Sequence, residues 1–341
     1  MGSSICRHRI FPNAAATDLG RIVIMQKKGR PAIDGMIASE HGVTRDGHPI
    51  SYNRAPAPDL APWIARLYAT VVEAPADYRL ECGLFNDTSI IRVQLKGHWT
   101  ATTVDGVREH EKAALLFGPQ TKLMPVSVTG SFISVGMSLR PGTGHALFKI
   151  KTVDLVDRLV PIQEIGLPAE AALQALEQSD DPEDWLQSLE QLSRQIVERA
   201  GKKLPDPLLA EFENICLTTP TMSVSEVARN LGVDKRRLER MVTRDFGMPP
   251  KQVLRRARAL DMASHLRGVA DDEEGDALAL RYYDQSHLIH EFVELFGMSP
   301  SQFVEKPQPI LTLALESRQA RRLEAINRIG PGAKRPWERP D

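Results

Sequence analysis

Positively charged side chains cluster between residues 222 and 267, and the chemistry open to them is the binding of phosphates. Eleven lysines and arginines stand there against five carboxylates, so the segment carries a formal charge of +6. The cations are Arg229, Lys235, Arg236, Arg237, Arg240, Arg244, Lys251, Arg255, Arg256, Arg258 and Arg267. Such a density of cationic groups releases counterions from a polyanion, which predicts binding of double-stranded DNA.

The same segment carries the signals of two short helices joined by a tight turn. Ser223 and Glu226 have the spacing of a capping box at a helix start, and Gly232 permits the turn. Asp234 is then placed to cap a second helix, which Gly247 is placed to end. A short helix, a glycine turn and a second helix form the layout of a helix-turn-helix.

The second helix of this unit is predicted to be amphipathic. We expect its apolar stripe to be buried, and this stripe consists of Leu238, Met241, Val242 and Phe246. The opposite face carries Arg236, Glu239, Arg240 and Thr243. Because the surrounding segment is strongly basic, we expect this polar face to enter a groove of DNA rather than to be only a solvated surface.

A second copy of the unit follows 50 residues later, where FGMPP at 246–250 recurs as FGMSP at 296–300. Residues 268–304 carry a formal charge of -7, so this copy cannot gain affinity by neutralising phosphates. Its predicted exposed face offers the neutral groups of Gln285, Ser286 and His290. Two interpretations stay open: these groups read base edges, or the second copy only packs against the first.

Two such units, joined by a basic helix predicted for residues 250–266, resemble the DNA-binding domain of the AraC/XylS family of transcription regulators. The text that carries the resemblance includes VSEVARNLGVDKRRLERMVTRDFGMPP at 224–250 and YYDQSHL at 282–288. It covers about residues 222 to 304. The resemblance implies a DNA-binding transcription regulator whose second helix in each unit faces the groove.

The candidate DNA contacts follow from this resemblance and from the charge of the first unit. They are Lys235, Arg236, Arg237, Glu239, Arg240 and Arg244 in the first unit, and Gln285, Ser286 and His290 in the second. The second unit departs from the family pattern at three positions. Arg281 stands where the family has a turn glycine, Asp276 where it has an aliphatic core residue, and His290 where arginine is frequent.

The part of the chain before residue 166 is predicted to form short antiparallel strands. Apolar and polar residues alternate in segments such as 89–95 and 134–140, and glycine and proline turns separate them. This pattern predicts an antiparallel β barrel or sandwich. The stretch SFISVGMSLRPGTGHALF at 131–148 resembles, more weakly, the cupin-like sensory domains that precede AraC-type units, which implies effector binding or dimerisation.

The expected architecture is α+β: a cupin-like antiparallel β barrel or sandwich followed by an all-α domain with two helix-turn-helix units. We divide the 341 residues into an irregular leader 1–55, a cupin-like sensory or dimerisation domain 56–165, helices and a linker 166–204, an AraC-type DNA-binding domain 205–307, and a C-terminal tail 308–341. Within the third segment, the apolar stripe from Trp185 to Ile196 is either a core contact or a dimer contact.

Composition favours a cytoplasmic protein. The net charge of -1, the absence of a long apolar run or a secretory signal, and three scattered cysteines argue against a membrane protein and a disulfide framework. We expect no cofactor, no metal and no catalytic residue.

The expected partners are double-stranded DNA, a small-molecule effector, RNA polymerase and a second copy of the chain. The alternative is a metal-dependent cupin-type enzyme using His98, His110 and His145.

Overall fold

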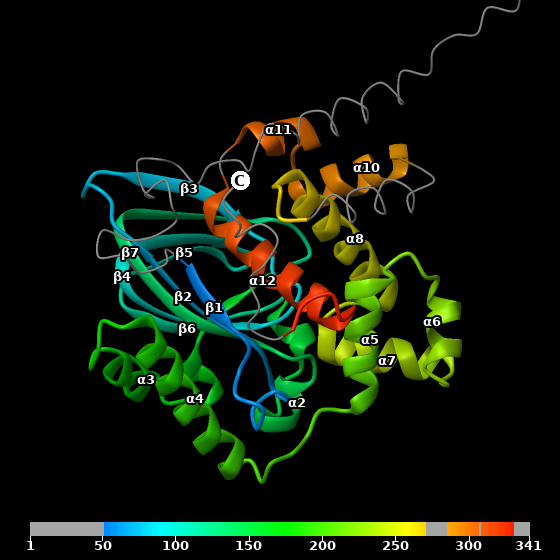
Figure 1. Cartoon of the computed structure of the whole chain (residues 1–341), viewed down its shortest axis with the longest axis horizontal. Coiled ribbons are helices and arrows are strands. Elements are labelled where there is room, and N and C mark those ends of the chain that lie inside the picture. The colour runs from blue at the N-terminus through cyan, green and yellow to red at the C-terminus, as the bar shows by residue number, and fades with distance from the viewer. Residues whose placement is uncertain (1–50, 271–284, 307, 331–341) are drawn as a thin grey trace, which may run out of the picture.

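The computed structural model of the chain describes residues 51–270, 285–306 and 308–330. The leader predicted for residues 1–55 lies outside these residues up to residue 50, and Ser51–Arg54 forms strand β1. Figure 1 shows a bent sheet on one side of the molecule and the helix-turn-helix elements on the other. No helix among the residues described is both long and apolar enough to cross a membrane.

Antiparallel strands build the N-terminal part. They are β1 (Ser51–Arg54), β2 (Ile64–Val72), β3 (Arg79–Leu84), β4 (Ile90–Thr103), β5 (Gly106–His110), β6 (Ala113–Phe117), β7 (Met124–Leu139) and β8 (Leu159–Pro161). The strand path runs β1-β2-β7-β4-β6-β8, with β3 paired to β7 and β5 paired to β4. The predicted antiparallel β domain of an α+β protein is therefore confirmed.

The sheet bends because its two longest strands change partners along their length. The first half of β7 pairs with β3 and the second half with β2, while β4 pairs first with β6 and then with β5. Register shifts between Gln94 and His98 and a left-handed φ of 103° at Gly97 mark the bend in β4. Among the strands described, β1 and β8 do not pair with each other, so the sheet is open, and of the two expected arrangements, barrel or sandwich, it does not form the closed barrel.

The convex, apolar face of the sheet packs against helices α3 (Ala169–Leu176) and α4 (Pro182–Arg199). Buried side chains of three strands form this core with Trp185 and Leu189 of α4: Leu67, Ala69, Ile91, Val93 and Val135. Asp181 caps α4 by accepting hydrogen bonds from the backbone N–H groups of Glu183 and Asp184. The apolar stripe of α4 thus makes an intramolecular core contact, one of the two interpretations left open.

Short elements and helices complete the chain. They are α2 (Thr143–Phe148), η1 (Thr152–Leu155), η2 (Ile162–Ile165), α5 (Pro207–Thr218), α6 (Val224–Asn230), α7 (Lys235–Phe246), α8 (Pro250–Leu266), α10 (Gln285–Phe296), α11 (Pro300–Glu305) and α12 (Pro309–Ala325). The basic helix predicted for residues 250–266 is α8, with the same bounds.

Helix α12 lies in the segment that we expected to be a C-terminal tail. It crosses from β3 to α5 and α8, between the sheet and the helical part (Figure 1). Leu311 and Leu315 of α12 pack into an apolar core shared with α8, α10 and α11, while Ile310 packs into the core inside the sheet. Because most side chains of α12, polar as well as apolar, are buried between the sheet and the helical part, this part of the segment is a structural element rather than a loose extension.

Candidate nucleic-acid interface

Helices α6 and α7 form the first helix-turn-helix, as the sequence predicts. The Ser223 hydroxyl accepts a hydrogen bond from the Glu226 backbone N–H at 3.3 Å, and the Glu226 carboxylate accepts one from the Ser223 N–H at 2.7 Å. This reciprocal capping box starts α6. Gly232, with a φ of 63°, makes the turn, and Asp234 caps α7 through the Arg237 backbone N–H at 2.8 Å. The predicted starts of both helices are confirmed.

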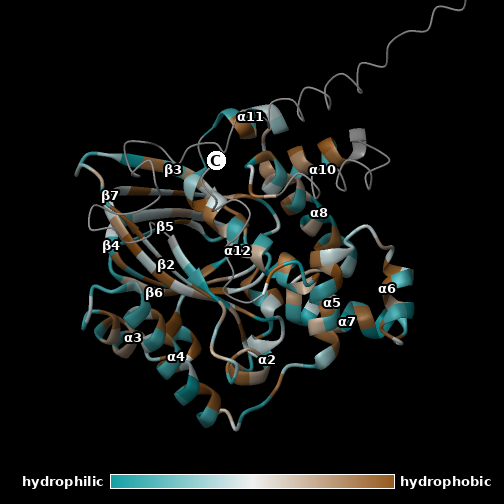
Figure 2. Cartoon of the chain, viewed as in Figure 1, coloured by the Kyte–Doolittle hydropathy of each residue, from teal (hydrophilic) through white to brown (hydrophobic). Residues whose placement is uncertain are grey.

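The two faces of α7 differ as predicted. Its apolar stripe is buried against α5, α6 and α8, and consists of Leu238, Met241, Val242 and Phe246. The other side chains of the helix produce a hydrophilic face, so that α7 carries both colours in Figure 2. The exposed residues of this face are Lys235, Arg236, Arg237, Glu239 and Arg240. Five of the six predicted contacts of the first unit are thus presented on one helix.

The second unit repeats α7 at the expected offset, because α10 begins and ends 50 residues after it. Leu288, Phe292 and Phe296 are buried at the positions of Leu238, Val242 and Phe246. His290 is exposed on α10. Gln285 and Ser286 begin the helix, but their side chains, like Arg281 and Asp276, lie outside the described residues.

Ion pairs hold α10 to α8. Arg258 donates to the buried carboxylate of Glu291 at 2.7 Å, and Arg255 donates to Glu291 at 3.1 Å and to Glu294 at 2.7 Å. The carboxylates beside His290 are therefore engaged by arginines of another helix. The two units form one block with α8 as its common support.

Comparisons with known proteins agree with this geometry. A family model described as a helix-turn-helix domain matches residues 227–306, which span both units. A second model, described as a domain of unknown function, DUF6597, matches residues 52–161 of the sheet. The C-terminal part of this chain is an AraC-type helix-turn-helix domain. No curated protein matches the sequence.

Solved structures with a similar arrangement have low sequence identity to this chain. Apo ToxT from Vibrio cholerae is 11% identical, covers 74% of this chain and 99% of its own, and superposes with a TM-score of 0.41. The AraC-like transcriptional activator CuxR is 13% identical, covers 67% of this chain and 90% of its own, and has a TM-score of 0.26.

The tertiary structure divides the eleven cations of residues 222–267 into two groups. Six are exposed: Arg229, Lys235, Arg236, Arg237, Arg240 and Lys251. The others bind partners within the protein: Arg244, Arg255, Arg256, Arg258 and Arg267. The formal charge of +6 therefore overstates the surface available to DNA, because part of it neutralises carboxylates or hydrogen-bonds to backbone carbonyls.

Arg244 is the predicted contact whose surroundings differ most from the expectation. Its guanidinium donates to the buried carboxylate of Asp245 at 2.6 Å, near the end of α7 that faces the sheet domain. The hydrogen bond to Asp245 raises the pKa of Arg244 above its usual value, against the effect of burial. This pairing engages Arg244 with the next residue of the same helix, and the exposed face of α7 does not depend on it.

The AraC-type domain is bound to the sheet by arginines whose role the sequence does not reveal. Arg256 of α8 donates to the backbone carbonyl of Asp87 at 2.6 Å. Arg318 of α12 pairs with Asp261 of α8, and Arg321 of α12 pairs with Glu213 of α5. The two residues of each pair lie from 57 to 169 positions apart in the chain, so no local sequence pattern predicts these contacts.

The histidines of the alternative enzyme hypothesis do not converge. His98 lies 3.4 Å from Glu111, and burial lowers the pKa of His110 to about 4, with a smaller effect of His98. His145 lies elsewhere, in α2. Among the residues described, no group of three or more His, Cys, Asp or Glu side chains is placed to hold a metal ion.

Proposed function

We propose that this protein is a sequence-specific DNA-binding regulator of transcription in the cytoplasm. The observation that carries the proposal is the exposed face of α7, where Lys235, Arg236, Arg237 and Arg240 surround Glu239 on the second helix of an AraC-type unit. A helix in that position of a helix-turn-helix inserts into the major groove, and arginines there can bind guanine edges or phosphates.

The second unit contributes less cationic surface to the same DNA. His290 is its exposed predicted contact, and Gln285 and Ser286 begin the same helix, α10. Helix α8, with 17 residues, spans about 25 Å at 1.5 Å per residue and keeps α7 and α10 on one support. We infer that both helices face the same side of a duplex, with affinity supplied mainly by α7 and selectivity by both.

The sheet domain supplies control in this proposal. It corresponds to the sensory or dimerisation domain that we place at about residues 56–165, ahead of a DNA-binding domain at about 205–307. A small-molecule effector, a homodimer through this domain, and contact with RNA polymerase are parts of the same proposal. Their support is the direct contact between sheet and AraC-type domain through Arg256 and α12, which gives a bound effector a physical route to α8.

Binding of the full chain to DNA tests the proposal. Genomic DNA fragments that bind the purified protein would first be selected. The affinity of the protein for these fragments would then be measured by fluorescence anisotropy at several salt concentrations. If the exposed cations of α7 each neutralise one phosphate, log K should fall with log salt at a slope of about -4. The double variant Arg236→Ala/Arg240→Ala should lower the magnitude of that slope by about 2.

The matched control is Arg199→Ala, which removes an exposed cation from α4, a helix that packs on β2 and β7. Its salt slope should equal that of the wild type. A wild-type slope near zero, or equal losses in the control and in the α7 variant, would refute the proposed DNA-binding surface.

A further inference from the structure

The face of the sheet turned toward α12 carries a buried polar patch beside its apolar core. In adjacent rows across β2, β7 and β4, Tyr68 pairs with Gly136 and Gly136 with Arg92, while Thr70 pairs with Ser134 and Ser134 with Gln94. We call these residues, together with Ser138, the inner face. Side chains two positions apart point the same way in a strand, so the members of each strand share one side of the sheet. An all-apolar core would not need these groups.

Gly136 creates the space at the centre of the inner face. A Cβ atom at this position would lie 2.5 Å from the Tyr68 hydroxyl oxygen and 2.4 Å from the Ile91 carbonyl oxygen. Because glycine has no Cβ, the Tyr68 ring can lie over β7 and approach Arg92 on the next strand. The Arg92 guanidinium carbon lies 5.4 Å from the centre of the Tyr68 ring and 5.2 Å from that of Phe117.

Arg92 is the one cation of the inner face, and its charge has no counterpart among the residues described. The residue is 4% exposed. Its guanidinium makes no ion pair with a described carboxylate, and its Nε has no hydrogen-bond partner. The two aromatic faces hold the guanidinium plane but do not neutralise it. A buried charge without a partner strongly destabilises a folded protein unless a partner is supplied.

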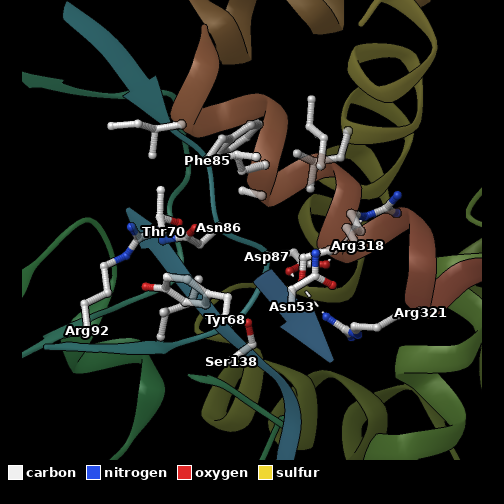
Figure 3. A pocket seen from close by; sticks show the side chains of 17 residues that line it. Asn53, Tyr68, Thr70, Phe85, Asn86, Asp87, Arg92, Ser138, Arg318 and Arg321 are labelled. Atoms are coloured by element: carbon white, nitrogen blue, oxygen red, sulfur yellow. Dashed lines mark ion pairs between the residues drawn. The ribbon is translucent and has the colours of Figure 1, made fainter. Parts of the chain in front are cut away.

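A cavity begins at this guanidinium. It lies between the inner face and helices α8 and α12, and the empty space among its lining atoms, including its opening to solvent, is about 670 Å³. Tyr68, Thr70, Asn86 and Arg92 line one part of it, as Figure 3 shows. The apolar part of the remaining wall is made of Phe85, Ile90, Leu260, Ile310, Leu313 and Leu315, and its charged part of Asp87, Arg318 and Arg321.

Further polar atoms at the same end of the cavity have no hydrogen-bond partner among the residues described. Both the amide nitrogen and the amide oxygen of the Asn86 side chain are buried without a hydrogen bond. Buried amides in native proteins are nearly always hydrogen-bonded, so such a group beside a cavity indicates a bound molecule. The side-chain amide of Asn86 can donate a hydrogen bond to an anion that pairs with Arg92.

The other charged residues that line the cavity have ion-pair partners, some of them outside the cavity. Asp87 lies 3.5 Å from Arg318 and 3.9 Å from Arg321, and both arginines also pair with carboxylates of the AraC-type domain. Figure 3 shows this cluster at the end of the cavity opposite to Arg92. The cavity is therefore left with one uncompensated positive charge.

We propose that the inner face, closed by α12, binds a small organic monocarboxylate whose carboxylate pairs with Arg92 and whose apolar body lies against α12. A carboxylate matches the planar fork of a guanidinium with two parallel hydrogen bonds, and its single charge neutralises the site. Pockets of this kind, apolar with a few polar anchors, are the usual form of small-ligand sites. The inference names the effector class of the proposed regulator and depends on that function only for its regulatory meaning.

The position of α12 couples this site to the DNA-binding helices. Leu313 and Ala314 of α12 line the cavity, and Arg318, one turn further on, pairs with Asp261 of α8. A ligand that fills the space under α12 contacts the same helix that is tied to the support of α7 and α10. Occupation of the cavity would change the free energy of that contact, which is the condition for coupling between two sites.

Calorimetric titration of the full chain with benzoate tests the site. Benzamide serves as the neutral probe of the same shape, and phenylacetate and hexanoate vary the apolar body. Benzoate should bind saturably with a Kd below ~10 mM, and benzamide at least tenfold more weakly. Arg92→Gln should weaken benzoate at least tenfold, and Arg92→Lys less, since lysine keeps the charge but loses the fork. Arg199→Ala, at an exposed cation of α4, should leave benzoate affinity unchanged.

A second variant tests the site independently, in case the substitutions at position 92 prevent folding. Ala314→Phe fills the cavity from α12 without touching Arg92, and should lower benzoate affinity while DNA affinity without ligand stays measurable. The carboxylate site is overturned if none of the three acids binds, if benzamide binds as well as benzoate, or if Ala314→Phe keeps full affinity. DNA binding, measured on the same preparations, separates the two proposals: loss of the carboxylate response alone refutes only this inference, and loss of DNA binding alone refutes only the regulator.

Discussion

Arg256 of α8 is 1% exposed, and its guanidinium donates a hydrogen bond at 2.6 Å to the backbone carbonyl of Asp87, in the loop that follows β3. A second hydrogen bond, at 3.1 Å, reaches the carbonyl of Gln120. The helix that joins the two helix-turn-helix units is thereby fixed to the sheet by a side chain that cannot reach DNA. Helix α8 therefore connects the DNA-binding helix α7 to the sheet domain.

The first prediction concerns Asp261, whose buried carboxylate accepts hydrogen bonds from Arg318 and Arg322 of α12. Asp261→Asn would leave these guanidinium groups with an uncompensated buried charge, so we expect the free energy of unfolding to fall by about 3–5 kcal/mol. Urea unfolding measures it. The matched control is Asp180→Asn, at an exposed carboxylate, which should change stability by less than about 0.5 kcal/mol. Equal values would show that α12 is not held through Asp261.

The second prediction concerns stability in acid. Desolvation by the surrounding protein opposes ionisation of Asp87, but Arg321, Arg318 and Arg256 outweigh it and hold the pKa of this carboxyl below its usual value. A carboxyl whose pKa is lower in the folded state stabilises the fold above its unfolded pKa of about 3.9, and this contribution is lost as pH falls through the folded value. Stability should therefore decline below about pH 4–5.

Urea unfolding between pH 7 and pH 3 measures this decline, and Asp87→Asn supplies the comparison. The variant should be less stable at pH 7 and should lose less stability on acidification than the wild type. Parallel curves for the two proteins would show that Asp87 does not contribute to the acid dependence. Exposed Asp180→Asn again serves as the control, and its curve should follow the wild type.

The third prediction concerns the division of labour between α7 and α10. Arg236→Ala or Arg240→Ala should weaken specific DNA binding by about 1–3 kcal/mol if the side chain contacts a base edge. His290→Ala should weaken it less, and His290→Arg should strengthen it by adding a cation at an exposed position. Anisotropy titrations give these values, and a larger effect at position 290 than at 236 or 240 would reverse the order of the two units.

A footprint of one protomer tests the geometry behind this order. Two units on α8 that enter successive major grooves should protect two short blocks about 34 Å apart, or 10–10.5 base pairs. Protection of a single block that is unaffected by His290→Arg would mean that α10 packs against α8 without meeting DNA. The ion pairs of Glu291 with Arg255 and Arg258 would then be the main role of that helix.

The fourth prediction concerns the thiols. Burial raises the pKa of Cys82 to about 12, and burial also raises the pKa of Cys216. Since the thiolate is the reactive form, neither group should react with Ellman's reagent at pH 8 in the folded protein. A Cys6→Ser variant removes the third thiol, so its folded form should release no colour and its unfolded form should release two equivalents. Rapid release by the folded variant would show that the cores around Cys82 or Cys216 open readily.

Local patterns in the sequence determined the two helix-turn-helix units. The capping box of Ser223 and Glu226, the turn at Gly232 and the repeat offset of 50 residues depend on neighbours within a few turns of helix, so they are legible without the fold. The alternation in the strands likewise predicted an antiparallel sheet. It did not predict that β4 and β7 change partners and leave the sheet open, because pairing is decided between distant segments.

Only the tertiary structure decided which arginines are available to a ligand. Arg240 and Arg256 lie on neighbouring helices of one basic segment, yet Arg240 is exposed and Arg256 is buried on carbonyls of the sheet domain. Arg92 is one charged residue in an alternating strand. It lines one end of a cavity because Gly136 on the next strand and α12, over 200 residues away, lie next to it in the folded chain. Charge is a property of the side chain, but the partner that neutralises it is set by the packing of elements far apart in the chain.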